Sequence, residues 1–230
     1  MTAHNVWTQG HAAHIVADAA SYWPDGTIEG FQSKIVAFPD QKMAMVGQGR
    51  LSSTRILGHV VKAAPVTQRD VIELMPVILR TIVSENEAVF PGDPVNCACI
   101  SAIAWDEATE RAVVYSVGSG GDAVVGGDPY VRYRGKGTLS PPMDAAHLSF
   151  ETMDPLEVGA DILRAQRLWT SPQHSDCHVV GGYGEAISVT RDGLSLVSRI
   201  IEWPEDAIGQ RIGGASTLHQ PRRLFVSGGI

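Results

Sequence analysis

Three residues near the start of the chain have the types and the spacing that hydrolytic chemistry requires. Thr2 follows the initiator methionine, Asp18 lies sixteen residues later at the end of an apolar run, and Lys34 lies sixteen residues beyond Asp18. A methionine before a small residue such as threonine is normally removable, so Thr2 can become the N-terminus. A hydroxyl, an amine and a carboxylate are then present in one constellation for nucleophilic catalysis.

The hydroxyl of a threonine needs a base, because its pKa lies far above neutrality. A free α-amino group has a pKa of about 7.7–8.0 and is covalently tethered to that hydroxyl, so Thr2 would supply its own base. A buried Lys34 beside the amine would keep the local potential positive and lower the amine's affinity for protons. Asp18 would compensate the charge of Lys34 and fix its orientation.

A glycine-flanked bend follows Lys34 by thirteen to fifteen residues and contains Gly47, Gln48 and Gly49. Backbone N–H groups at such a bend can bind the oxyanion of a tetrahedral intermediate, where one donor contributes roughly 2.7–4 kcal/mol. We therefore expect these three residues to form the oxyanion hole and part of the substrate-binding surface.

These segments, AHNVWTQGHAAHIVAD after Thr2, then SKIVAF and AMVGQG, resemble the proteasome-type β-subunit family of N-terminal nucleophile hydrolases. In that family an N-terminal threonine is followed by an aspartate in an "AD" or "VD" pair, by a lysine in a "KI" pair, and by a glycine turn that leads into a helix. The segments DPLEVGADILRAQR and VVGGYGEAISVTRDG look like the family's closing region. The resemblance covers most of the chain, and its specificity lies in the first fifty residues.

The resemblance implies an α+β fold, a four-layer αββα sandwich of two mostly antiparallel sheets covered by helices, in a single domain over residues 1–230. It implies a threonine-type peptidase or amidohydrolase that cleaves peptide bonds through an acyl-enzyme on Thr2 and needs no cofactor. Members of the family assemble as rings or other homo-oligomers, so a homo-oligomer is expected here.

The family also has a Ser-Gly pair whose serine supports the terminal amine. Ser119, within VGSGGD, matches that pair best, and Ser140 is the alternative. A second family motif, an aspartate three residues before Ser-Gly-Gly, is altered in this chain. Val180 stands in the serine position and Cys177 in the aspartate position, although the two glycines are present.

Two other functions stay open on the sequence alone. A chain that keeps Met1 has an ordinary amide in place of the free amine, so it would be a catalytically inactive structural or assembly protein with a proteasome-like fold. An N-terminal nucleophile amidase that acts on small molecules is the other alternative. A substrate profile would separate this amidase from the peptidase.

The composition excludes several classes of protein. The 230 residues have a net charge of −7, which disfavours nucleic acid as a partner. No apolar stretch reaches eighteen residues, which disfavours a membrane span. The N-terminus lacks the pattern of a signal peptide, and three cysteines cannot pair evenly, so we expect reduced thiols and a cytoplasmic location.

The search for other motifs gives little. No phosphate-binding loop or dinucleotide fingerprint is present. His174, Asp176 and His178 alternate along one strand face, but no second group of ligands accompanies them, so no metal site is predicted. Cys97 and Cys99 alternate within an apolar strand, which indicates buried small hydrophobes rather than a redox pair.

The hydrophobic pattern then predicts the elements that position these residues. We expect helices over 51–64, 68–84 and 155–168, with a cap at Thr67 and a kink or a division at Pro76. Strands are expected over 3–9, 12–19, 34–38, 42–47, 97–105, 111–117, 129–133, 178–190 and 194–201, and residues 138–153 carry no clear pattern.

Overall fold

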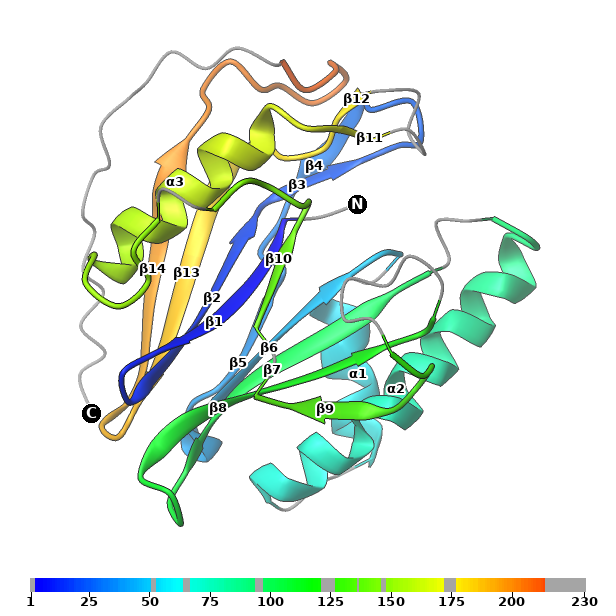
Figure 1. The fold of residues 1–230 in the computed structure, drawn as a ribbon. Coiled ribbons are helices and arrows are strands. Elements are labelled where there is room, and N and C mark those ends of the chain that lie inside the picture. Colours follow the sequence, from blue (N-terminus) through cyan, green and yellow to red (C-terminus); the bar gives the residue numbers. More distant parts are fainter. Residues whose placement is uncertain are drawn as a thin grey trace.

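The computed structural model describes residues 3–50, 53–63, 67–93, 97–120, 127–135, 137–145, 148–171 and 177–213. About 40% of this part of the chain is strand and 26% is helix. Its strands form two five-stranded sheets and two two-stranded sheets (Figure 1). All the strand pairs are antiparallel.

The first five-stranded sheet has the order β10-β1-β2-β13-β14, so β2 is its central strand and the N-terminal strand β1 lies between β2 and β10. β1 and β2 form a hairpin, and β2 also pairs with β13, which sets Gly184 opposite Asp18. The bounds are β1 His4–Gln9, β2 Ala12–Asp18, β10 Thr138–Ser140, β13 Tyr183–Thr190 and β14 Gly193–Glu202.

The second five-stranded sheet has the order β5-β6-β7-β8-β9. Its bounds are β5 Ile35–Phe38, β6 Met43–Gln48, β7 Cys99–Asp106, β8 Arg111–Gly118 and β9 Arg132–Arg134, with a short 3-10 helix, Pro39–Gln41, between β5 and β6. The two small sheets pair β3 Ala20–Tyr22 with β4 Ile28–Phe31, and β11 Thr170–Ser171 with β12 Cys177–His178.

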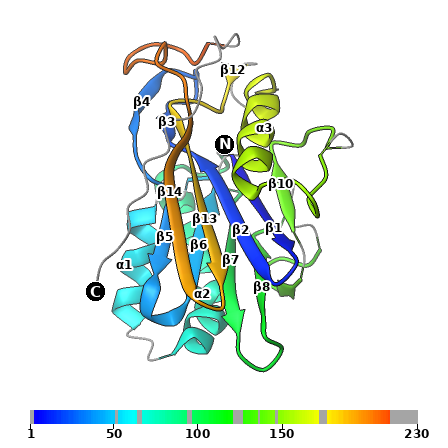
Figure 2. The same cartoon turned by 90° about the vertical axis from the view of Figure 1, so that its left-hand side faces the viewer.

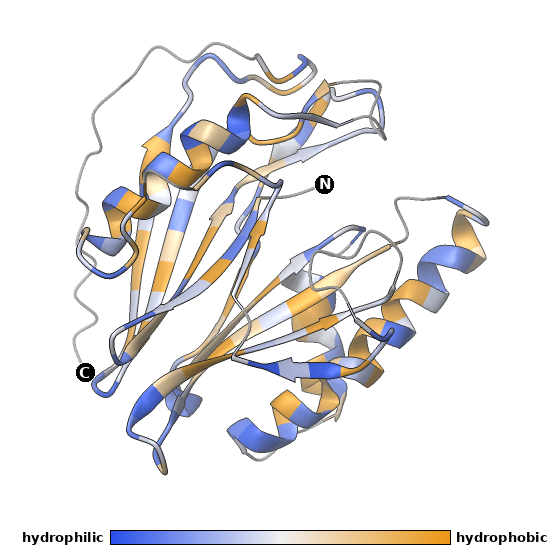
Figure 3. Ribbon diagram, viewed as in Figure 1, coloured by the Kyte–Doolittle hydropathy of each residue, from blue (hydrophilic) through white to orange (hydrophobic). Residues whose placement is uncertain are grey.

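The helices pack on the outer faces of these sheets (Figures 1 and 2). α1 (Ser53–Ala63) and α2 (Gln68–Val89) bury their apolar stripes against the second sheet in a cluster that includes Ile56, Met75 and Leu79. α3 (Pro155–Arg167) packs against the first sheet through Val158, Ile162 and Leu163. Figure 3 shows the resulting change from apolar to polar residues around each helix.

A third apolar cluster lies between the two five-stranded sheets. Val6, Ile15 and Ile187 come from the first sheet, and Val46 and Ile103 come from the second. Because these side chains are almost fully buried, the hydrophobic effect holds the two sheets face to face. The candidate site residues lie where strands of the two sheets end.

The prediction of a four-layer αββα sandwich is wrong. Strand exceeds helix, the described residues contain only three α-helices, and the strands divide among four sheets. In the described part of the chain, α3 is the α-helix that packs on the first sheet, because the described residues between β8 and α3 form β9, β10, turns and irregular segments. Glycine and proline explain this local choice, since Gly127, Gly135 and Pro141 disfavour a helix interior.

The predicted helices agree with the structure more closely than the predicted layers do. Thr67 caps α2 with a capping box, since its side chain accepts from the Asp70 N–H and the Asp70 carboxylate accepts from the Thr67 N–H. α2 runs from Gln68 to Val89 without a break, so a division at Pro76 did not occur and the helix extends past residue 84.

Candidate functional site

Asp18 is the centre of a buried hydrogen-bond cluster at the end of β2. Its side chain is inaccessible to solvent, and its two oxygens accept from three donors. Oδ1 accepts from the Ala3 N–H at 2.9 Å and from the Lys34 Nζ at 2.8 Å, and Oδ2 accepts from the Gly181 N–H at 3.1 Å. A buried carboxylate requires such donors, so the three contacts fix its position.

Lys34 comes from the other sheet, directly before β5, and is 6% exposed. Burial lowers the pKa of Lys34, while the charge and hydrogen bond of Asp18, and then the charge of Glu185, oppose that change. The Asp18–Lys34 ion pair therefore joins the two sheets. Breaking such a pair leaves one charge buried without compensation.

Thr2 lies outside the described residues, and Ala3 is the first that the structure describes. The Ala3 nitrogen that donates to Asp18 is the nitrogen of the peptide bond between Thr2 and Ala3. This hydrogen bond brings the start of β1 to the Asp18–Lys34 pair. Asp18 and Lys34, sixteen residues apart in the sequence, are thus in contact, and the backbone N–H directly after Thr2 contacts the same carboxylate.

The sequence predicted a bend that contains Gly47, Gln48 and Gly49, but β6 continues to Gln48. Gly47 and Gln48 are therefore the last two residues of that strand. The β5–β6 pairing ends at Ile35 and Val46, so Lys34 and Gly47 each lie one residue beyond that end of the pairing. Gly49 has a φ of 99°, and a Cβ there would lie 2.6 Å from the Cys97 carbonyl oxygen. The turn therefore begins at Gly49 and requires glycine.

The side chain of Gln48 links β6 to β10. Its Nε2 donates to the Ser140 Oγ at 2.9 Å, and its Oε1 lies 3.7 Å from the Cys99 Sγ. Ser140 is 2% exposed and is the pairing partner of His4 on β1. This serine thus lies on the strand beside the N-terminal residues.

Ser119, the first candidate for supporting the terminal amine, has other partners. Its Oγ accepts from the Ala98 N–H at 2.9 Å, and its own N–H donates to the Ala98 carbonyl at 2.9 Å. Among the described residues, no hydrogen bond joins it to Asp18 or Lys34. The structure brings together Asp18, Lys34 and the Ala3 nitrogen, and it brings Ser140 rather than Ser119 to β1.

Glu185 is a residue of this region that the sequence reasoning missed. It lies on β13 opposite Ala17, is 7% exposed, and its charge acts on Lys34. Ala17 belongs to the cluster between the sheets, and paired residues point to the same side of a sheet, so Glu185 faces that interior. A carboxylate at an otherwise apolar strand position was the available sequence signal.

A second buried polar chain begins at His4. The His4 Nε2 lies 2.8 Å from the Ser101 Oγ, which lies 2.7 Å from the Ser116 Oγ. Burial lowers the pKa of His4 to about 3, so its ring is neutral at physiological pH. Burial also raises the pKa of the Cys99 thiol to about 12, which makes that thiol unreactive, whereas Cys97 is exposed rather than buried as predicted.

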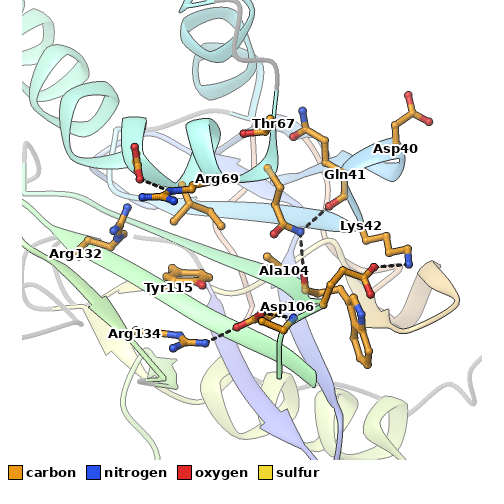
Figure 4. A pocket seen from close by; sticks show the side chains of 16 residues that line it. Asp40, Gln41, Lys42, Thr67, Arg69, Ala104, Asp106, Tyr115, Arg132 and Arg134 are labelled. Atoms are coloured by element: carbon orange, nitrogen blue, oxygen red, sulfur yellow. Dashed lines mark hydrogen bonds and ion pairs between the residues drawn. The ribbon is translucent and has the colours of Figure 1, made fainter. Parts of the chain in front are cut away.

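A cleft of about 760 Å³ lies elsewhere, between the start of α2, the β7–β8 hairpin and β9 (Figure 4). None of its lining residues belongs to the Asp18 cluster. Most of its charged side chains pair with one another: Lys42 with Glu107, Arg69 with Glu73 one turn further along α2, and Arg134 with Asp106. The cleft therefore presents little uncompensated charge to a ligand.

No group of three or more histidine, cysteine, aspartate or glutamate side chains suited to a metal occurs within the described ranges. His174 and Asp176 lie outside those ranges. In the same part of the chain, no helix has the length and apolar character to cross a membrane.

No protein-family model matches the sequence, and no curated protein matches it. Any functional conclusion therefore depends on the residues and their geometry.

Proposed function

We propose that the protein is a proteasome-like threonine hydrolase that cleaves peptide bonds through an acyl-enzyme on Thr2. One observation carries the proposal: the Asp18 Oδ1 accepts from both the Lys34 ammonium and the Ala3 N–H, which directly follows Thr2. A buried lysine–aspartate pair beside the first residues of a strand is the environment that an N-terminal nucleophile needs.

The chemistry begins with removal of Met1, which frees the α-amine of Thr2. The amine takes the proton from the hydroxyl as the oxygen attacks the carbonyl carbon of the substrate, and the carbonyl π electrons move to its oxygen. The tetrahedral intermediate collapses, the C–N bond breaks, and the ammonium gives its proton to the leaving amine. Water, deprotonated by the α-amine, then attacks the ester, releases the acid and regenerates the hydroxyl.

Lys34 and Gly47 have distinct parts in this proposal. The positive charge of Lys34 lowers the proton affinity of the α-amine, so that more of it is neutral and able to act as base. Gly47 lies one residue past the end of the β5–β6 pairing, at the same end as Lys34. Backbone N–H groups of Gly47, Gln48 or Gly49 would donate to the oxyanion.

The wider setting follows from the resemblance and the composition. The substrate is a peptide, the protein acts as a homo-oligomer in the cytoplasm, and no cofactor takes part. Sedimentation of the purified protein over a range of concentrations tests the oligomer separately from the chemistry.

The test of the nucleophile is the intact mass of the purified protein, with and without a peptide epoxyketone, which reacts with a hydroxyl and an adjacent free amine. We expect a mass without Met1 and one adduct. Thr2→Ala should give no adduct, whereas Thr8→Ala, an exposed threonine on β1, should react like the wild type. Peptide hydrolysis that persists in Thr2→Ala would contradict the proposal.

An inactive assembly protein is the second candidate, and the 177–182 segment favours it. Val180 is fully buried where the family has a serine, and the Cys177 Sγ donates to the Asp25 carbonyl at 3.0 Å. This candidate predicts a mass that retains Met1 and no adduct. A third possibility, an amidase for small molecules, would form the adduct but hydrolyse simple amides faster than peptides.

A further inference from the structure

Arg167 is a buried charge at the last position of α3. It is 1% exposed although it lies four residues after Leu163, on the apolar stripe of the helix. Its guanidinium binds Asp206 through two hydrogen bonds, from Nη2 at 2.7 Å and from Nη1 at 2.9 Å, and lies 4.6 Å from the ring centroid of Trp203. Such a two-point contact fixes the orientation of both side chains.

Asp206 lies in the segment that follows β14, and its carboxylate also reaches the turn before β13. Its Oδ2 accepts from the Gly182 N–H at 2.7 Å. A Cβ at Gly181 would lie 2.5 Å from the same oxygen, so the turn approaches Asp206 as closely as a glycine allows. The Arg167 Nη1 completes the contact, since it donates to the Val180 carbonyl at 2.9 Å.

The turn held in this way is the one that contacts Asp18. Val180 accepts from Arg167, Gly182 donates to Asp206, and the residue between them, Gly181, donates to the Asp18 Oδ2. Three consecutive residues are thus held between the Arg167–Asp206 pair on one side and Asp18 on the other. The pair touches neither Asp18 nor Lys34 directly through any hydrogen bond or ion pair that the structure describes.

We infer that Arg167 and Asp206 are positioning residues that hold the Val180–Gly182 turn so that Gly181 can orient Asp18 toward Lys34. The inference rests on the proposed function, and it makes the segment after β14 a part of the catalytic apparatus. In this inference, Arg167 and Asp206 support the turn in place of the serine and the aspartate that the family has at the positions of Val180 and Cys177.

Stabilisation of the fold alone does not explain the buried Arg167–Asp206 ion pair. Two charges removed from water lose hydration, and well-packed apolar residues of similar volume are often as stabilising as a buried ion pair. The pair has a geometric consequence that apolar residues would lack, because it supplies a donor to Val180 and an acceptor to Gly182. These two contacts fix the backbone on both sides of the Gly181 N–H.

The test is the double variant Arg167→Met/Asp206→Asn, which leaves the net charge unchanged. Arg164→Met/Asp161→Asn is the matched control, because that ion pair lies on the same helix, is partly exposed, and makes no contact with the turn in the described chain. One readout is the pKa of Lys34, from a titration of its side-chain NMR signals. The other is the pH dependence of labelling by the epoxyketone.

In the double variant we expect the pKa of Lys34 to fall by about one pH unit, because Asp18 raises it and would be displaced. We expect the labelling rate to fall by about 100-fold, as for a misplacement of about 1 Å. The control should change neither. A folded double variant with the pKa of Lys34 and the pH profile of the control would overturn the inference.

A conservative variant covers the case in which the double variant does not fold. Arg167→Lys keeps the charge but loses the two-point contact. It should shift the pKa of Lys34 in the same direction by less, and an unchanged value would count against the inference. If the wild type is never labelled but the pKa of Lys34 shifts as expected, the proposed function fails while the positioning of Asp18 by this pair is upheld.

Discussion

Asp18 and Lys34 form a buried ion pair of 2.8 Å that joins the end of β2 in one five-stranded sheet to the residue before β5 in the other. The Ala3 N–H shares the same carboxylate oxygen. The pair therefore connects the two sheets and the N-terminal strand at one point. Loss of either charge should affect both the stability of the fold and any chemistry at the N-terminus.

Asp18→Asn tests this connection. The variant leaves Lys34 buried without a counter-charge, so we expect a loss of about 3–5 kcal/mol in the free energy of unfolding and no epoxyketone labelling. Urea unfolding measures the first. Asp106→Asn breaks the more exposed pair with Arg134 and should cost about 1 kcal/mol or less. Equal losses in the two variants would contradict the role given to Asp18.

Gly49→Ala tests the turn after β6. Alanine would have to adopt a φ of 99°, with its Cβ 2.6 Å from the Cys97 carbonyl oxygen, so we expect a loss of about 3 kcal/mol or more. Gly10→Ala is the control, because Gly10 also has a positive φ but nothing lies within 4 Å of its Cβ position. That control should lose about 1 kcal/mol. Thermal and urea unfolding of both variants measure these losses of stability, and equal losses would contradict the requirement for glycine at position 49.

Ser140→Ala and Ser119→Ala separate the two serines. Ser140 binds Gln48 beside β1, whereas Ser119 binds only the backbone of Ala98 in the hydrogen bonds that the structure describes. We expect Ser140→Ala to reduce the rate of epoxyketone labelling by about tenfold through loss of support to Gln48. Ser119→Ala should leave that rate unchanged and cost about 1 kcal/mol of stability. The reverse order of labelling rates would restore Ser119 as the supporting serine.

Local signals in the sequence account for the elements and for part of the site. Hydrophobic periodicity and the capping residue Thr67 predicted α2, because helix formation depends on residues three and four apart. The Asp18–Lys34 contact followed from spacing and from the resemblance to a known family. These features need no knowledge of which strands pair at long range.

The rest of the site depends on contacts that local patterns do not encode. The Asp18–Gly181 hydrogen bond spans 163 residues, and it exists because β13 pairs with β2 in one register. Arg167 offered a signal, a charge on an apolar helix stripe, but its partner Asp206 lies in a segment without a hydrophobic pattern. The prediction of the layered fold was wrong for a similar reason, since β9 pairs with β8 in one sheet and β10 pairs with β1 in the other, whereas residues 138–153 carry no clear pattern in the sequence.

His4 should make the protein sensitive to acid. Its pKa falls from 6.5 in the unfolded chain to about 3 in the folded protein, because the ring is buried. Between these values the unfolded chain binds the proton, so the stability that is present above pH 6.5 is lost progressively as the pH falls toward 3. From pH 6.5 to pH 4.5 the loss is about 2 kcal/mol for this one group.

Urea unfolding at several pH values measures that loss. His4→Gln removes the titrating group and keeps hydrogen-bonding capacity toward Ser101, so its stability should depend less on pH in this range. His14, whose pKa burial lowers to about 4, still titrates in both proteins and cancels in the comparison. Identical pH dependence in the wild type and His4→Gln would show that His4 is not held neutral by burial.

Glu185→Gln tests the electrostatics around Lys34. The charge of Glu185 raises the pKa of Lys34 against the effect of burial, so its removal should lower that pKa further. It should also make the potential at the site more positive, which lowers the proton affinity of a nearby amine. We therefore expect the rising limb of the labelling rate to move to lower pH.

The matched control for that variant is Glu202→Gln. Glu202 is on β14 beside Glu185's strand, but its side chain is 42% exposed and paired with Arg199, so its charge is screened by solvent. The pH profile of labelling should be that of the wild type in this variant. If Glu185→Gln and Glu202→Gln shift the profile equally, the effect belongs to the overall charge of the protein. A shift confined to Glu185→Gln, together with a lower pKa of Lys34 by NMR, would assign it to the buried carboxylate beside the ion pair.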